Sequence, residues 1–199
     1  MTGILGIYLF DERWNVGNFG VYGLMALQHR GQETAGLELM GRSRQRVSGE
    51  GLVEDVLSHV VAEGHICLGA VSPYPAEARG DIQPFPLSEN VSVAVDGRIT
   101  GVEGYSWNGS LSYEDNLRRA FAGFAGGRRD IETVKEFFDN CRGGFAYVAV
   151  NDGKEMVAGR CSLGVKPLSL GKFGFEGGIV ASESCVMDVI GERVPISPA

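Results

Sequence analysis

The residue with the most direct chemical potential is Thr2, which follows the initiator Met1. Thr2 is small, so Met1 can be trimmed to leave a free α-amine on the same residue as the hydroxyl. An N-terminal residue of this kind acts as a nucleophile with its own amine as the base. If Met1 is retained, the amine is locked in a peptide bond, and a hydroxyl is in any case far less acidic than a thiol. In the alternative interpretation, Thr2 is a small residue without a catalytic role.

The composition limits the classes of function. A net charge of −7 disfavours nucleic acid and anionic membranes as partners, since both attract basic patches. The basic cluster Arg128–Arg129 is too short to reverse this. Without a long apolar run or a signal peptide, we expect a cytoplasmic protein. Four cysteines without Cys-x-x-Cys spacing argue against structural zinc and favour free thiols, and no metal or cofactor is expected.

Strands and helices must position these residues, and they occur in separate blocks. Apolar spacing predicts helices within 16–28, 52–60, 117–124, 131–138 and 183–190. Apolar runs predict strands at 3–9, 34–40, 66–71, 91–95, 145–150, 155–159, 166–170 and 178–182. Asp96-Gly97 predicts a hairpin turn, and the proline-rich 73–86 a long functional loop. The pattern indicates an α+β protein built in packed layers.

Several motifs, in order along nearly the whole chain, resemble those of a known family. Met1–Ile7 resembles the start of class II glutamine amidotransferase domains, which are N-terminal-nucleophile hydrolases, with Thr2 in place of the family's Cys. Other segments most resemble the glutaminase domain of glutamine phosphoribosylpyrophosphate amidotransferases: Gln28–Gly36, Gly51–Val56, Gln83–Phe85, Gly159–Leu168 and Ala181–Cys185. The resemblance implies a four-layer αββα sandwich over residues 1–199 as a single domain, without that family's phosphoribosyltransferase domain.

The resemblance also assigns site positions, and most of them carry a changed residue. Ser72 stands where the family has an Arg that clamps the glutamine carboxylate, and serine cannot form a bidentate charge-assisted pair. Asp96 stands where the family has an Asn donor of the oxyanion hole, beside Gly97, which keeps its backbone N–H. A carboxylate there would repel the developing oxyanion, and one lost donor costs about 10²–10³ in rate. In the alternative, Asp96-Gly97 is only a turn.

Two further positions concern the amino group of glutamine and the neighbourhood of the nucleophile. Tyr113 stands where the family has an Asp that holds the α-amine, and Glu114 takes over if the register shifts by one residue. Otherwise Glu114 is an ordinary acid at a helix N-terminus. Arg30 matches an Arg that lies near the nucleophile in the family. Its alternative role is that of a scaffold residue held by buried carbonyl groups.

Three nearby residues are expected to be structural. His29 precedes Arg30 and is expected to pack in the fold. Cys161 is expected to be a small buried hydrophobic residue. Arg79 follows Ser72 by seven positions and is expected to be a solvated surface residue rather than a replacement clamp.

These residues lead to three functional hypotheses. The first is a catalytically degenerate amidotransferase-like domain that acts as a subunit, scaffold or regulatory partner in a larger enzyme system. Its partner would be a synthase or transferase subunit, or a second copy of the chain. The second is an active glutamine amidohydrolase that uses Thr2 and supplies ammonia to a separate synthase. The third is a non-catalytic sensor of a small amide or amino acid, with a pocket formed by Ser72, Asp96, Gly97 and Tyr113.

Overall fold

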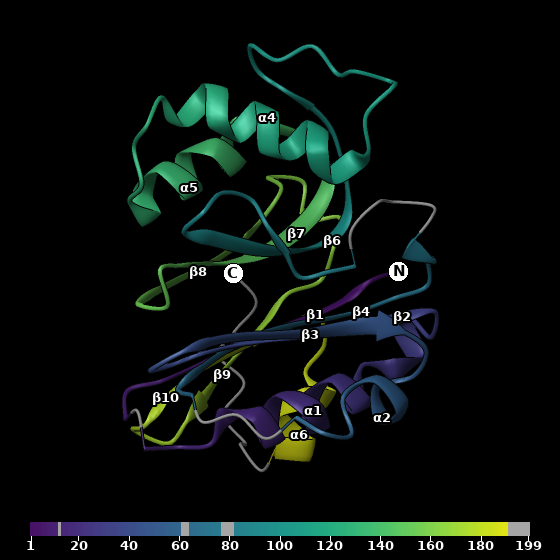
Figure 1. The fold of residues 1–199 in the computed structure, drawn as a ribbon, viewed down its shortest axis with the longest axis vertical. Helices are drawn as coiled ribbons and strands as arrows, with labels where there is room; N and C mark the ends of the chain where they lie inside the picture. Colours follow the sequence, from purple (N-terminus) through teal and green to yellow (C-terminus); the bar gives the residue numbers. More distant parts are fainter. Residues whose placement is uncertain (12, 61–63, 77–81, 191–199) are drawn as a thin grey trace.

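The computed structural model describes residues 1–11, 13–60, 64–76 and 82–190. Two antiparallel sheets lie face to face, and helices cover their outer sides (Figure 1). On the first sheet lie α1 (Val16–Ala26), α2 (Val53–Val56) and α6 (Cys185–Ile190). On the second lie α4 (Tyr113–Ala125) and α5 (Ile131–Asp139). The predicted α+β class and four-layer αββα arrangement are confirmed.

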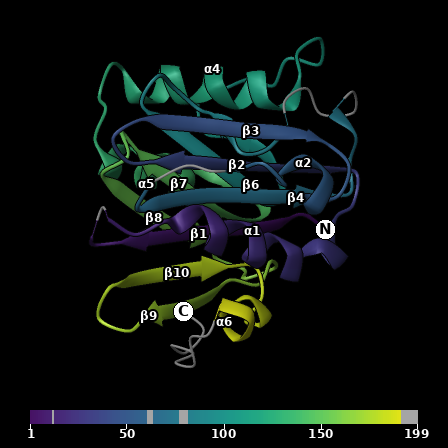
Figure 2. The same ribbon diagram turned by 60° about the horizontal axis from the view of Figure 1, so that its bottom comes forward.

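The first sheet contains the strand that follows Thr2 (Figure 2). Its strands, in spatial order, are β3 (Arg44–Glu50), β2 (Thr34–Met40), β4 (Ile66–Ser72), β1 (Gly3–Leu9), β10 (Gly177–Ala181) and β9 (Ser169–Phe173). β1 pairs with β4 on one side and with β10 on the other. Layers cover both faces of these central strands, which explains why their sequences are continuous apolar runs rather than alternating ones.

The second sheet provides the other wall of the site. Its strands, in order, are β5 (Phe85–Pro86), β6 (Val91–Val102), β7 (Cys141–Asn151) and β8 (Glu155–Arg160). The long β6–β7 pair runs from Val91 opposite Asn151 to Val102 opposite Cys141, with one irregularity between Ile99 and Gly101. Asp96 and Gly97 therefore lie in the middle of a long paired strand.

Three apolar clusters fill the spaces between the four layers. The first lies between α1, α6 and the first sheet and includes Leu24 and Val186. The second lies between the two sheets and includes Leu68 and Val148. The third, between the second sheet and its helices, includes Phe137. Within the described ranges, no helix is both long and apolar enough to cross a membrane.

The structure corrects several expectations about individual elements. The hairpin turn at Asp96-Gly97 is wrong, because β6 continues through both residues. Gly97 has a φ of +94°, and a Cβ there would lie 2.1 Å from the carbonyl oxygen of Gly144. Glycine is required here for backbone geometry and close strand approach, not for a turn. β3 had not been predicted because it is largely exposed and polar.

Several predicted elements have different bounds, and the strand expected at 91–95 runs to Val102. The helix expected within 52–60 is limited to Val53–Val56, although Leu57 and Val60 are still buried. The strand expected at 166–170 begins at Ser169, which leaves Lys166 in the preceding loop. This difference matters for the site, because the loop is free to direct the Lys166 side chain toward β6.

Candidate functional site

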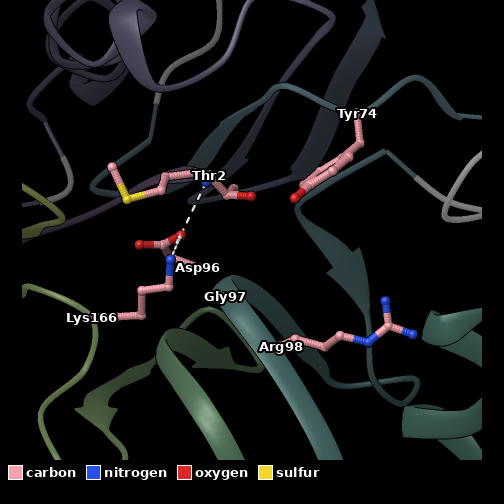
Figure 3. A pocket seen from close by; sticks show the side chains of 7 residues that line it. Thr2, Tyr74, Asp96, Gly97, Arg98 and Lys166 are labelled. Atoms are coloured by element: carbon pink, nitrogen blue, oxygen red, sulfur yellow. Dashed lines mark hydrogen bonds and ion pairs between the residues drawn. The ribbon is translucent and has the colours of Figure 1, made fainter.

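Thr2 lies immediately before β1 and faces the second sheet. Its backbone N–H donates to Oδ1 of Asp96 in β6 at 3.0 Å, so the N-terminal segment is tied to the opposite sheet (Figure 3). Thr2 is 1% exposed. Its hydroxyl oxygen is buried and has no hydrogen-bond partner among the residues the structure describes. The position has the hydroxyl of a nucleophile, but no base among the described residues is hydrogen-bonded to that hydroxyl.

Arg30 holds Thr2 and Asp96 together. It ends the short 3₁₀ helix η1 (Gln28–Arg30), which follows α1. Its Nε donates to the carbonyl oxygen of Thr2 at 3.1 Å, and one terminal nitrogen donates to Oδ2 of Asp96 at 2.6 Å. The other terminal nitrogen donates to Oε1 of Glu183 at 2.5 Å. Arg30 thus lies next to Thr2, and two carboxylates and one carbonyl hold it rather than carbonyl groups alone.

Glu183 extends this network to the surface. Its Oε2 lies 3.0 Å from Nε2 of His29, whose Nδ1 lies 3.1 Å from the carbonyl oxygen of Ala26. The hydrogen bond from Arg30, followed by the effects of His29, holds the pKa of the Glu183 carboxyl below its usual range, although burial opposes this. The His29 side chain is 56% exposed, so the expectation that it packs inside the fold is wrong.

Asp96 is a buried carboxylate between two cations. It is 0% exposed, and it pairs with Arg30 at 2.6 Å and with Nζ of Lys166 at 3.6 Å. The sequence had suggested a negative charge that would repel an oxyanion. The structure shows instead that Arg30 and Lys166 compensate this charge. Both carboxyl oxygens of Asp96 already face donors on Thr2, Arg30 and Lys166, so Asp96 does not replace the amide donor of an oxyanion hole.

A cavity of about 520 Å³ opens beside these residues. Its wall is formed by Met1, Thr2, Tyr74, Asp96, Gly97, Arg98 and Lys166 (Figure 3). Along the edge of β6 that does not pair with β7, the backbone N–H and carbonyl of Val95 form hydrogen bonds with the side-chain amide of Gln83. On the same edge, the N–H of Ile99 donates to the Tyr113 hydroxyl.

The predicted substrate-binding residues divide into two groups. Asp96 and Gly97 line the cavity, but Ser72, Tyr113 and Glu114 are not in its wall. The Ser72 hydroxyl accepts the Tyr74 N–H at 3.3 Å. The Tyr113 hydroxyl accepts the Ile99 N–H at 2.9 Å. Glu114 lies in the first turn of α4, as its alternative interpretation as a helix N-terminal acid expected, and it is completely buried there.

Sequence reasoning missed three polar residues of the cavity. Lys166 belongs to the Gly159–Leu168 segment, in which the sequence predicted no site residue, and Arg98 directly follows Asp96-Gly97. Tyr74 lies in the proline-rich loop that had been expected to carry function. The available signal was the presence of two cations in or next to motif segments. Arg79 lies outside the described residues.

Cys161 differs from its expected role. It is partly exposed, and it lies at a second cavity of about 590 Å³ formed with Arg160 and Leu163. Its modest burial raises the thiol pKa, but hydrogen bonds from the backbone around Val165 and Phe145 outweigh this, and the pKa is lowered. Cys161 is therefore partly exposed rather than fully buried, contrary to the expectation. No group of three or more potential metal ligands occurs within the described part of the chain.

Comparison with known proteins finds relatives of one kind. No protein-family model matches it. It is 30% identical over 210 residues to an amidophosphoribosyltransferase of Methanocaldococcus jannaschii, a match that covers 96% of this chain and 44% of that protein. It is 28% identical over 223 residues to one of Pseudomonas aeruginosa, covering 96% of this chain and 43% of the other. The chain thus spans less than half the length of these relatives.

Two solved structures share the fold. One is described as the allosteric regulatory enzyme of purine biosynthesis, with a TM-score of 0.75 and 26% identity, over 98% of this chain and 45% of the other. The second is the glutamine phosphoribosylpyrophosphate amidotransferase of B. subtilis with ADP and GMP, with a TM-score of 0.74 and 24% identity over the same shares. The chain is a glutamine amidotransferase-like domain with the N-terminal-nucleophile hydrolase fold, related to the amidophosphoribosyltransferases.

Proposed function

We propose that this domain does not hydrolyse glutamine and acts as a subunit, scaffold or regulatory partner of a larger cytoplasmic enzyme system. One observation carries the proposal. Asp96, a buried carboxylate paired with Arg30, binds the backbone nitrogen of Thr2 at 3.0 Å. That nitrogen is the atom that would serve as the base of an N-terminal nucleophile.

Asp96 opposes base catalysis whether or not Met1 is removed. If Met1 is retained, the Thr2 nitrogen is an amide N–H that donates to Asp96 and has no basicity to contribute. If Met1 is removed, the nitrogen becomes an α-amine beside a buried carboxylate. A nearby negative charge favours the protonated form of an amine. The amine would then be held as an ammonium ion, which cannot accept the proton of the Thr2 hydroxyl.

The groups expected to stabilise the oxyanion and to bind the glutamine carboxylate are also largely missing. At the position of the family's Asn donor, Asp96 presents oxygens that are already bound by Thr2 and Arg30. The Gly97 N–H is then the only part of the expected oxyanion hole that is retained. Ser72, at the position of the family's Arg, is a neutral hydroxyl outside the cavity wall. These losses act on the same step, so their costs in rate do not simply multiply.

The decisive experiment measures ammonia and glutamate release from L-glutamine by the purified protein, together with its intact mass. We expect no release above that of a Thr2→Ala control. Release that disappears in Thr2→Ala would contradict the proposal. The mass shows whether Met1 is retained, so a negative result in unprocessed protein can be repeated after aminopeptidase treatment.

A second candidate function is glutamine hydrolysis by Thr2 after loss of Met1, with the ammonia passed to a separate synthase. It is favoured by one observation, namely that Thr2 lines an open cavity that also contains a lysine, Lys166. This candidate predicts a mass lower by one Met and covalent labelling of Thr2 by an electrophilic glutamine analogue. An unlabelled Thr2 in correctly processed protein would exclude it.

A further inference from the structure

We infer that the cavity beside Thr2 binds a small organic carboxylate that lacks an ammonium group. This inference rests on the proposed function, because an active hydrolase would need the same cavity for glutamine. A volume of about 520 Å³ lies within the usual range of small-ligand sites. The wall also brings two cations, Lys166 and Arg98, to either side of Gly97 in a protein with a net charge of −7.

The charges that face the cavity are predominantly positive. Asp96 is matched by Arg30 at 2.6 Å, and Lys166, at 3.6 Å, is a second cation on the same carboxylate. Glu183, the other partner of Arg30, does not line the cavity and is shared with His29. Arg98 lies 5.7 Å from the centre of the Tyr113 ring, and no carboxylate of the described residues pairs with it. The cavity wall therefore favours an anion.

The hydrogen-bonding groups of the wall select for acceptors on the ligand. Three residues of the wall, Lys166, Arg98 and Tyr74, carry side-chain hydrogen-bond donors. The only carboxylate in the described wall is Asp96, and its oxygens are engaged by Thr2, Arg30 and Lys166. An α-ammonium group would therefore find no carboxylate available to it, whereas a carboxylate would find several donors.

Gly97 allows this arrangement of donors. A Cβ at this position would lie 2.9 Å from Cε of Lys166 and 2.1 Å from the carbonyl oxygen of Gly144. Without a side chain at position 97, the Lys166 side chain can pass Gly97 and bring its ammonium group within 3.6 Å of Asp96. Arg98 lies next to Gly97 in β6, and its side chain extends away from Asp96 (Figure 3).

Three ligands of the same length test the inference by calorimetry. Glutaramate carries a carboxylate and an amide, glutaramide is its neutral counterpart, and L-glutamine adds an ammonium group to glutaramate. We expect glutaramate to bind at least about tenfold more tightly than glutaramide, the effect of one charge-assisted hydrogen bond, and more tightly than L-glutamine, whose ammonium group adds a positive charge beside Lys166 and Arg98. Equal binding of glutaramide, tighter binding of L-glutamine, or no binding of glutaramate at millimolar concentration would overturn the inference.

Variants locate the bound carboxylate. Lys166→Gln should weaken glutaramate binding about tenfold, whereas Lys166→Arg should retain it and Lys172→Gln, a distant exposed lysine on β9, should leave it unchanged. Unchanged binding in folded Lys166→Gln would count against the assignment. The two proposals fail separately: ammonia release from L-glutamine overturns the proposed function, whereas absent glutaramate binding without ammonia release overturns only this inference.

Discussion

At the residue scale, Asp96 links the two halves of the sandwich. It lies in the second sheet, and its partner Arg30 lies beside the first, with side chains 0% and 2% exposed. Breaking a buried ion pair at one partner leaves the other charge uncompensated, which typically costs ~3–5 kcal/mol. Arg30 keeps Glu183 as a partner, so we expect a loss near the lower end of this range for Asp96→Asn.

The matched control for this substitution is Asp152→Asn. Asp152 pairs with Lys154 at 3.4 Å, and both side chains are more than half exposed. Exposed pairs contribute little, so this change should alter the free energy of unfolding by no more than ~0.5 kcal/mol. Urea denaturation of both variants gives the comparison. Equal effects of the two substitutions would show that the Asp96–Arg30 pair has no special structural role.

The contribution of Glu183 to the stability of the protein depends on pH. Its folded-state pKa is lowered, chiefly by the hydrogen bond from Arg30, so its stabilising effect is present above the ordinary Glu pKa of about 4.5. The effect is lost as the pH falls through the lower, folded-state value. The difference in urea midpoint between the wild type and Glu183→Gln should therefore be constant near neutral pH and shrink in acid. A difference that grows on acidification would contradict this assignment.

The site could be predicted from the sequence only where a motif fixes a backbone position. Thr2, Arg30, Asp96 and Gly97 do meet in space, and their motifs indicated this. Ser72 and Tyr113 do not line the cavity. The Ser72 hydroxyl accepts a hydrogen bond from the backbone of Tyr74, and the Tyr113 hydroxyl accepts one from the backbone of Ile99. The charge of Asp96 was misjudged because its partners Arg30 and Lys166 are remote in sequence.

At the element scale, close packing of η1 on β4 explains the glycine of the Gln28–Gly36 motif. Gly31 has an extended backbone, with a φ of −175°, so its conformation does not require glycine. A Cβ there would instead lie 2.3–2.6 Å from backbone atoms of Ser72. Backbone cannot move aside as a flexible side chain can, so we expect Gly31→Ala to destabilise the protein by about 1–3 kcal/mol or more.

Gly123→Ala is the opposite case. Gly123 lies inside α4, and a Cβ there meets no atom within 4 Å. Alanine favours the helix over glycine by ~0.5–1 kcal/mol, so this substitution should stabilise the protein. Thermal and urea denaturation should move the two glycine variants in opposite directions. A neutral Gly31→Ala would show that η1 and β4 can separate without cost.

Elements were predictable where periodicity and burial agree, as the apolar runs of β1, β2 and β4 show. They were not predictable where tertiary contacts override local signals. β6 passes through an Asp-Gly pair because β7 supplies partners along its whole length. The polar edge strand β3 is defined by pairing with β2 rather than by its own sequence.

At the scale of the whole molecule, the order of the layers could not be derived from composition or spacing. The central strands of the two facing sheets are buried by partners that lie far away in sequence, such as Gly6 against Val148. Periodicity identifies an apolar face but not the element that covers it. The number of layers was therefore available only through resemblance, and the structure then shows why three separate apolar clusters are needed.

The middle cluster should couple both outer layers into one cooperative unit. The chain has two tryptophans, and each reports on one side. The ring centres of Trp14 and of Phe19 in α1 lie 6.2 Å apart, and those of Trp107 and of Tyr113 in α4 lie 5.9 Å apart. In Trp107→Phe the remaining Trp14 reports on the side of the first sheet, and in Trp14→Phe the remaining Trp107 reports on the side of the second sheet. Because the middle cluster is shared, we expect the urea midpoint by fluorescence to coincide with that by circular dichroism in each variant.

Leu68→Ala supplies the stringent form of this test. Leu68 is completely buried between the sheets. Its truncation should cost about 2–5 kcal/mol, including the cavity that remains. If the middle cluster couples the layers, this loss should appear equally in the Trp14 and Trp107 signals when Leu68→Ala is combined with each single-tryptophan background. A loss confined to one signal would mean that the sheets unfold independently and that the Arg30–Asp96 bridge between them is not enough to couple them.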